Sequence, residues 1–216
     1  MKTVSMLLCL SAFAVSSILA KTIKPEYPKP LFGSGPDFAD LPNLEKPDAS
    51  KVVKEFEVPD TAENVAKGKS VTSSAAPVIG KLSMITDDNL DGFDDNVVEL
   101  PAGPQWVQID LGATHTVHKV FLWHYLRKFS PYKSVVIQVS NDRDFKTGVT
   151  AIWNSDYANI LGFGAGKDPA YLETNHGRLM DGKDIKGRYV RLWSNGSALY
   201  DVNHYIEVQV YGSPAK

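Results

Sequence analysis

Short segments in which apolar and polar residues alternate recur along the last two thirds of the chain, and they constrain the fold more than any other feature. In the segment 105–111, QWVQIDL, the residues Val107, Ile109 and Leu111 fall on one face. The same period of two is found in the segments 118–125, 134–140, 188–193 and 205–212. This period is typical of half-buried β-strands, and stretches rich in Gly, Asn, Asp and Pro separate the segments. The pattern predicts an all-β fold, an antiparallel β-sandwich, over residues 61–213.

The segment 154–187 is long and polar, and we expect it to be a loop that either carries function or is ordered by a local contact. Within it, GFGAGKD lacks the glycine spacing of a phosphate-binding loop, and Asp168 stands where that loop needs Ser or Thr. Six side chains of the segment are further candidates to line a pocket, namely Tyr157, Tyr171, Glu173, Asn175, His176 and Arg178.

The first twenty residues have the pattern of a secretory signal peptide. A lysine precedes an apolar run from Met6 to Val15, and small residues lead to Ala20, after which we expect cleavage. The apolar run is too short to span a membrane. Cleavage would also remove Cys9, the only cysteine, so disulfides are not expected to stabilise the mature protein. We therefore predict a signal peptide over 1–20 and a secreted or extracytoplasmic protein, which in a bacterium would be periplasmic or at the cell surface.

A proline-rich segment follows over residues 21–60 and holds seven of the 13 prolines of the chain. Proline removes a backbone donor and favours an extended chain, so the segment is predicted to be a linker or an arm. The alternative to a simple spacer is that Tyr27, Leu31 and Phe32 dock onto the domain.

Composition and charge limit the possible functions. The 216 residues are 43% hydrophobic and carry a net charge of −2, which fits one globular domain with short additions. Nucleic acids and anionic membranes would favour a basic face, which this balance does not indicate. The sequence contains neither G-x-S-x-G nor H-E-x-x-H, and the mature chain would have no cysteine nucleophile. We therefore expect that the protein is not an enzyme.

Five motifs, taken in their order and spacing, resemble a known family. They are NVAKGKSVTSS (64–74), TDDNLDG (86–92), QWVQIDLG (105–112), YVRLW (189–193) and YIEVQVYG (205–212). Together they resemble the discoidin domain, the coagulation factor V/VIII type C module of the galactose-binding-like superfamily. The resemblance implies a jelly-roll sandwich of about eight strands, with ligands bound by loops at one end. Members bind glycans, phospholipids or proteins, so the resemblance does not by itself give the ligand.

The acidic loop is a candidate calcium site. Asp87, Asn89 and Asp91 occupy the first three ligand places of the D-x-[DN]-x-[DN]-G pattern, but Val98 stands where an EF-hand needs its bidentate acid. The loop is therefore not an EF-hand. Related modules hold one calcium ion with a loop aspartate, backbone carbonyls and a glutamate on the last strand. That resemblance implies a structural Ca²⁺ at Asp87, Asn89, Asp91 and Glu207. The alternative is a solvated acidic turn.

Sugar recognition needs an aromatic ring and a few convergent polar groups. The segment 123–132, WHYLRKFSPY, offers both, and an arginine just after this strand contacts sugar hydroxyls in glycan-binding relatives. Arg127 matches that position, although the asparagine that often follows it is absent. The segment NHY, 203–205, is expected to lie at the same end of the sandwich as the segment 123–132. The alternatives are core packing for Trp123 and a structural hydrogen bond for His204. The candidate ligand-binding residues are Trp123, His124, Tyr125, Arg127, Asn203 and His204.

These expectations combine into a secreted, non-catalytic binding module that recognises a glycan or glycoconjugate and carries a structural calcium ion. The competing hypothesis is a protein-interaction or structural module of a larger extracellular assembly, without affinity for sugar. We expect no nucleic-acid partner. Phospholipid binding would want apolar loop tips in basic surroundings, and Phe93 stands alone among acidic residues, so we do not expect membrane binding either.

Overall fold

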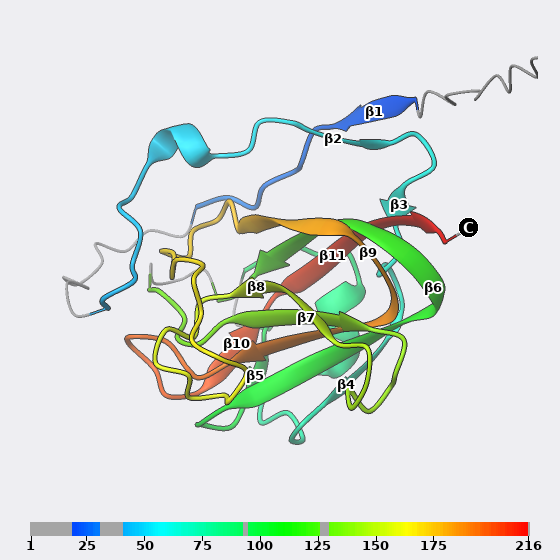
Figure 1. Ribbon diagram of the computed structural model, residues 1–216. Helices are drawn as coiled ribbons and strands as arrows, with labels where there is room; N and C mark the ends of the chain where they lie inside the picture. Colours follow the sequence, from blue (N-terminus) through cyan, green and yellow to red (C-terminus); the bar gives the residue numbers. More distant parts are fainter. Residues whose placement is uncertain (1–18, 31–40, 93–94, 126–129, 216) are drawn as a thin grey trace, which may run out of the picture.

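The computed structural model describes residues 19–30, 41–92, 95–125 and 130–215. It is an antiparallel β-sandwich, as the alternating segments predicted (Figure 1). Within these ranges no helix has the length and apolar character needed to cross a membrane. The elements are β1 (Ala20–Ile23), η1 (Ala49–Lys51), β2 (Phe56–Pro59), β3 (Glu63–Asn64), β4 (Ser70–Ser73), η2 (Leu82–Thr86), β5 (Val98–Leu100), β6 (Gln105–Trp123), β7 (Val136–Ser140), β8 (Thr150–Asn154), β9 (Arg178–Ser194), β10 (Asn203–Tyr205) and β11 (Glu207–Pro214).

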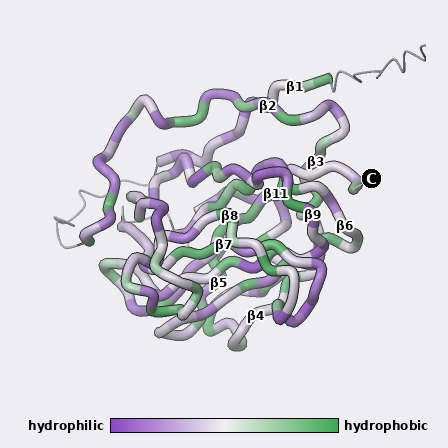
Figure 2. Tube along the Cα trace, in the orientation of Figure 1, coloured by the Kyte–Doolittle hydropathy of each residue, from purple (hydrophilic) through white to green (hydrophobic). Residues whose placement is uncertain are grey.

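Two long strands, β6 and β9, run through both layers of the sandwich. The main sheet has the order β3-β11-β6-β9-β7-β8, and β4 also pairs with β6. The first part of β6 pairs with β4 and with the end of β9, whereas its last part pairs with β11 and with the start of β9. Side chains from both parts, such as Ile109 and Leu122, are buried in one hydrophobic core. Figure 2 shows the hydrophobic residues concentrated on the strands and the hydrophilic ones along the connecting loops.

The segment 154–187 contains more strand than the sequence predicted, because β9 already begins at Arg178. The prediction of a loop is therefore wrong for the last ten residues of the segment, 178–187. The register between β6 and β9 shifts beside Lys119, where Lys183 and Asp184 adopt positive φ angles of 55° and 54°. This bulge has the sequence Asp-Gly-Lys-Asp, and such a composition favours turns, so it hides the strand on both sides of it.

The described parts of the proline-rich arm, residues 21–30 and 41–60, lie along the outer face of the sandwich and contact it (Figure 1). In the arm, β1 pairs with β2, with Ile23 opposite Phe56. Phe56 is buried against the outward-facing side of the sheet, at ring-centroid distances of 6.3 Å from Phe121 and 5.0 Å from Tyr211. A second hydrophobic cluster therefore forms outside the main sheet, and the arm supplies one side of it.

Of the three arm residues that were considered for docking onto the domain, Tyr27 is the one that the structure describes. Its ring lies edge-on to Phe121 at 6.3 Å and to His176 at 4.9 Å, and its hydroxyl donates a hydrogen bond to the carbonyl of Val53. Leu31 and Phe32 lie outside the described residues, as do the first eighteen residues of the predicted signal peptide. Tyr27 thus ties the first half of the arm both to its second half and to the sandwich.

Candidate functional site

One end of the sandwich is built from loops that Asn203 holds together. Its Nδ2 donates to the carbonyls of Pro101 and Gly103, each at 2.9 Å. Its Oδ1 accepts from the hydroxyl of Ser194 at 2.7 Å and from the backbone N–H of Gly196 at 2.8 Å. Asn203 is fully buried. We predicted that it contacts a ligand, but both polar atoms of its side-chain amide already form hydrogen bonds that hold these loops.

The segment that follows β6 lies beside the loop between β9 and β10. The backbone N–H of Lys133 donates to the carbonyl of Gly196, and that of Asn195 donates to the carbonyl of Lys133, both at 2.9 Å. Ala198 donates in the same way to Pro131 at 2.9 Å. The two segments that the sequence analysis expected at one end of the sandwich are therefore neighbours.

His204 lies beneath the surface of this end. Its Nε2 is 3.0 Å from Oε2 of Glu99, and its Nδ1 is 3.0 Å from the hydroxyl of Tyr132. A carboxylate only accepts hydrogen bonds, so Nε2 carries the proton and Nδ1 accepts from Tyr132. Burial lowers the pKa of His204, although Glu99 opposes this shift. Tyr125 stacks on the imidazole at 5.1 Å and Tyr200 meets its edge at 5.7 Å.

These two tyrosines form the accessible part of the site. Tyr125 and Tyr200 are both partly exposed, whereas His204 between them is only 6% exposed. Two apolar side chains, Val78 and Ile79, are exposed on the adjoining loop, which a β-bridge joins to Glu99. The end of the sandwich thus presents aromatic rings on a base of hydrogen-bonded polar side chains.

Trp123 was a candidate ligand-binding residue, and the structure places it in the interior. Its ring is fully buried and stacks on Phe121 at 4.1 Å. Its Nε1 donates to the carbonyl of Asn175 at 3.2 Å. No face of the ring is open to a sugar, so the alternative of core packing holds for this residue.

His124 is also fully buried and does not face a ligand. Its Nδ1 lies 2.9 Å from Oε2 of Glu173, and its ring stacks on Tyr132 at 4.0 Å. Burial raises the pKa of Glu173, and the hydrogen bond with His124 opposes this shift. The pair joins the loop after β6 to the segment before β9. His124 is therefore a positioning residue of the interior.

Of the six predicted ligand residues, Tyr125 is the described one that stays at the surface. Arg127 lies outside the described residues. Two residues of the site were missed by the sequence analysis, Glu99 as a partner of His204 and Tyr200 as an aromatic wall. Tyr200 sits in a loop without alternation, and its only signal was an aromatic residue close to the segment NHY.

The predicted metal ligand Glu207 is fully buried beside the acidic loop. Its Oε2 accepts a hydrogen bond from the backbone N–H of Asp88 at 3.1 Å, while Oε1 has no partner within the described part of the chain. Burial, followed by the negative charges of Asp87 and Asp88, raises the pKa of Glu207 to about 9. An ionised carboxylate at this position is thus unfavourable unless a cation neutralises it.

The acidic loop itself is closed by hydrogen bonds between residues of the loop. Oδ1 of Asp87 accepts from the N–H of Asn89, and Oδ1 of Asn89 accepts from the N–H of Asp91, both at 3.0 Å. Asn96 donates to the carbonyls of Asn89 and Asp91. Over the described ranges no three His, Cys, Asp or Glu side chains are grouped so that they could hold a metal ion. Any ion between this loop and Glu207 would therefore depend on backbone carbonyls as well.

Comparison with known proteins places this geometry among related folds. Residues 85–192 match the family model described as the NedA-like, galactose-binding domain. A fucose-binding module of Streptococcus pneumoniae matches with a TM-score of 0.51 and 20% identity, over 69% of this chain and 97% of that module. A family 89 glycoside hydrolase of Clostridium perfringens matches with a TM-score of 0.53 and 15% identity over 70% of this chain. The chain spans only 15% of that hydrolase. No curated protein matches the chain.

Proposed function

The chain belongs to the family of NedA-like, galactose-binding domains, and on that premise we propose that it is a non-catalytic carbohydrate-binding module. The observation that carries the proposal is the pair of partly exposed tyrosines, Tyr125 and Tyr200, held against His204 at the loop end of the sandwich. Aromatic rings take the C–H face of a sugar, and few residue types supply this surface at so low an entropic cost.

The arrangement beneath the tyrosines supports a rigid site. Glu99 and Tyr132 fix both ring nitrogens of His204, and the imidazole in turn fixes the two tyrosine rings. A preorganised site binds more tightly because less side-chain freedom is lost when the ligand arrives. The proposed ligand is a glycan or glycoconjugate, in keeping with the sugar-binding modules that share this fold.

We further propose that a structural calcium ion binds between the acidic loop and Glu207. The buried Oε1 of Glu207, which has no hydrogen-bond partner among the described residues, supports this, because a hard cation takes carboxylate and carbonyl oxygens. The ion would be held by Glu207, by the loop residues Asp87, Asn89 and Asp91 and by backbone carbonyls of the loop. It would supply a positive charge that fixes the loop to β11. Secretion through the predicted signal peptide completes the proposal.

The proposal is tested with a glycan array in calcium, followed by titration of the best glycan into the wild type and two variants. Tyr125→Ala and Tyr200→Ala are each expected to weaken binding about tenfold or more, with melting temperatures close to that of the wild type. The matched control is Tyr157→Ala, since Tyr157 is 44% exposed on a different loop, and it should bind as the wild type does. Absence of any glycan binding would favour the competing protein-interaction module.

A further inference from the structure

Arg178, at the start of β9, lies where the arm meets the sandwich, and two aromatic rings fix its orientation. Its guanidinium carbon is 5.2 Å from the centre of the Trp153 ring and 5.0 Å from that of Tyr171. The side chain is only 20% exposed. A planar guanidinium that is held against ring faces keeps its donors in a fixed direction, and this fork matches the two oxygens of a carboxylate.

The carboxylate that Arg178 binds in the free protein belongs to the arm. Nη1 of Arg178 donates to Oε1 of Glu45, and Nη2 donates to Oε2 at 3.2 Å. Lys51 donates to the same Oε2 at 2.8 Å. Two cations thus converge on one carboxylate. Asp48 lines the same cavity, so two carboxylates balance these two cations, and a further anion gains most by taking the place of the Glu45 carboxylate.

The backbone of Glu45 is anchored separately from its side chain. Its N–H donates to the carbonyl of Ala170 at 2.9 Å, and the N–H of Ala170 donates to the carbonyl of Asn43 at 3.0 Å. Nδ2 of Asn43 also donates to the carbonyl of Ser155 at 2.9 Å. The arm is therefore anchored to the sandwich by contacts that do not depend on the Glu45 side chain.

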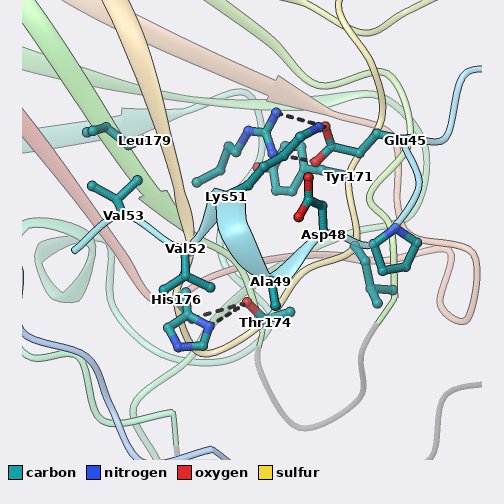
Figure 3. Close-up of a pocket in the computed structure, with 14 residues that line it drawn as sticks. Glu45, Asp48, Ala49, Lys51, Val52, Val53, Tyr171, Thr174, His176 and Leu179 are labelled. Atoms are coloured by element: carbon teal, nitrogen blue, oxygen red, sulfur yellow. Dashed lines mark hydrogen bonds and ion pairs between the residues drawn. The ribbon is translucent and has the colours of Figure 1, made fainter. Parts of the chain in front are cut away.

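A cavity of about 590 Å³ opens beside this ion pair, with a volume in the range of small-ligand sites. Figure 3 shows Lys51 and Glu45 at one end of it and Thr174 and His176 at the other, with Val52, Ala49 and the carboxylate of Asp48 between the two ends. One wall is the arm, which lies outside the residues matched by the family model. Neither Tyr125 nor Tyr200, the tyrosines of the loop end, lines this cavity.

We propose that this cavity is a second binding site, for a sugar that carries a carboxylate, and that the Glu45 side chain occupies its anion position until such a ligand displaces it. A uronic acid has the matching sequence of groups. Its carboxylate pairs with Arg178 and Lys51, and its C–H face lies on Val52 and Ala49. Its hydroxyls reach Thr174, His176 and the carboxylate of Asp48. The inference goes beyond the proposed function, because it concerns another part of the surface and another class of sugar.

The test uses the full chain and calorimetric titration with trigalacturonate, and with a neutral galactose trisaccharide for comparison. Glu45→Gln keeps the shape of the side chain and removes its charge, so trigalacturonate should bind about tenfold more tightly or better, as expected when an internal competitor is removed. Arg178→Gln should abolish that binding. Glu57→Gln is the matched control, because Glu57 is an exposed glutamate of the same arm, and it should leave the affinity unchanged.

Three outcomes would overturn the inference. The first is that Glu45→Gln binds trigalacturonate no more tightly than the wild type does. The second is that a folded Arg178→Gln still binds trigalacturonate. The third is that the wild type binds a triglutamate peptide as tightly as it binds trigalacturonate. If Arg178→Gln is unfolded, Arg178→Lys gives the same test, because lysine keeps the charge but loses the bidentate fork and should weaken binding. Binding of the neutral galactose trisaccharide tests the site at the loop end. If the wild type binds trigalacturonate but no neutral sugar, the proposed function is contradicted and this inference stands.

Discussion

Nε2 of His204 lies 3.0 Å from Oε2 of Glu99, so a buried imidazole and a carboxylate on neighbouring strands are hydrogen-bonded directly below the candidate sugar site. Glu99 is the main group that opposes the lowering of the His204 pKa by burial. The pair therefore joins the side chains of β10 and β5 directly below that site.

The first prediction concerns pH. The folded pKa of His204 lies below its unfolded value of 6.5, so the folded state favours the neutral ring. Its contribution to stability is present above pH 6.5 and is lost as the pH falls through the folded pKa. Glu99→Gln should lower this pKa further and increase the loss in acid. Two-dimensional NMR of the imidazole and urea unfolding between pH 5 and 8 measure both effects, and a raised pKa in the variant would contradict the prediction.

The second prediction concerns calcium. Saturating Ca²⁺ should raise the melting temperature by about 5 °C or more, since an ion at a hundred times its Kd adds about 2.7 kcal/mol. Glu207→Gln should abolish this shift and should melt no lower than the wild type in chelator, because it removes a carboxylate whose burial is unfavourable. Differential scanning calorimetry measures both. The control Glu57→Gln is expected to keep the full shift, and an unchanged shift in Glu207→Gln would refute the proposed site.

The third prediction concerns the arm. Phe56→Ala should reduce the free energy of unfolding by about 3 kcal/mol, because the ring is 8% exposed and fills the second hydrophobic cluster. Phe163→Ala is the control, since that ring is 42% exposed and should cost much less. Urea titration measures both variants. Equal losses would mean that the arm adds little stability to the sandwich.

The fourth prediction concerns a tight backbone contact. Gly177 has a φ of +58°, and a Cβ there would lie 2.6 Å from Nε1 of Trp123 and 2.7 Å from the carbonyl oxygen of Leu122. Gly177→Ala should therefore lose clearly more stability than the roughly 1 kcal/mol expected from backbone strain alone. Gly162→Ala isolates that strain, because Gly162 has a φ of +77° and open space around it. Thermal unfolding of the two variants compares them, and similar values would contradict the contact.

The strands were predictable from the sequence where one face is buried and the other is not. Val107, Ile109 and Leu111 lie in the main core as their alternation predicted. The start of β9 was not predictable, because turn-forming residues interrupt it at Gly182. Nor was it predictable that 105–111 and 118–123 form one strand, since the link between them is mostly polar and exposed.

The candidate site was less predictable, for a physical reason. Alternation sets Phe121 and Trp123 on the face of the strand opposite to Val120 and Leu122, but only the structure shows that the arm covers that face. His124 is paired with Glu173, and His204 with Glu99, and both partners are far away in the chain. Local sequence patterns carry no information on such pairs, so buried histidines were taken for ligand contacts.

The passage of β6 and β9 through both layers also determines how the chain must fold. Gln105 pairs with Ser194 and Leu122 pairs with Arg178. In the sequence, β7 and β8 therefore both lie between the paired strands β6 and β9. Pairings between such distant residues are slow to form because the loop between them must first be closed. Neither layer can be completed before β9 has been synthesised. A nascent chain is therefore expected to remain unfolded until its last quarter has left the ribosome, and then to form both layers in one cooperative step.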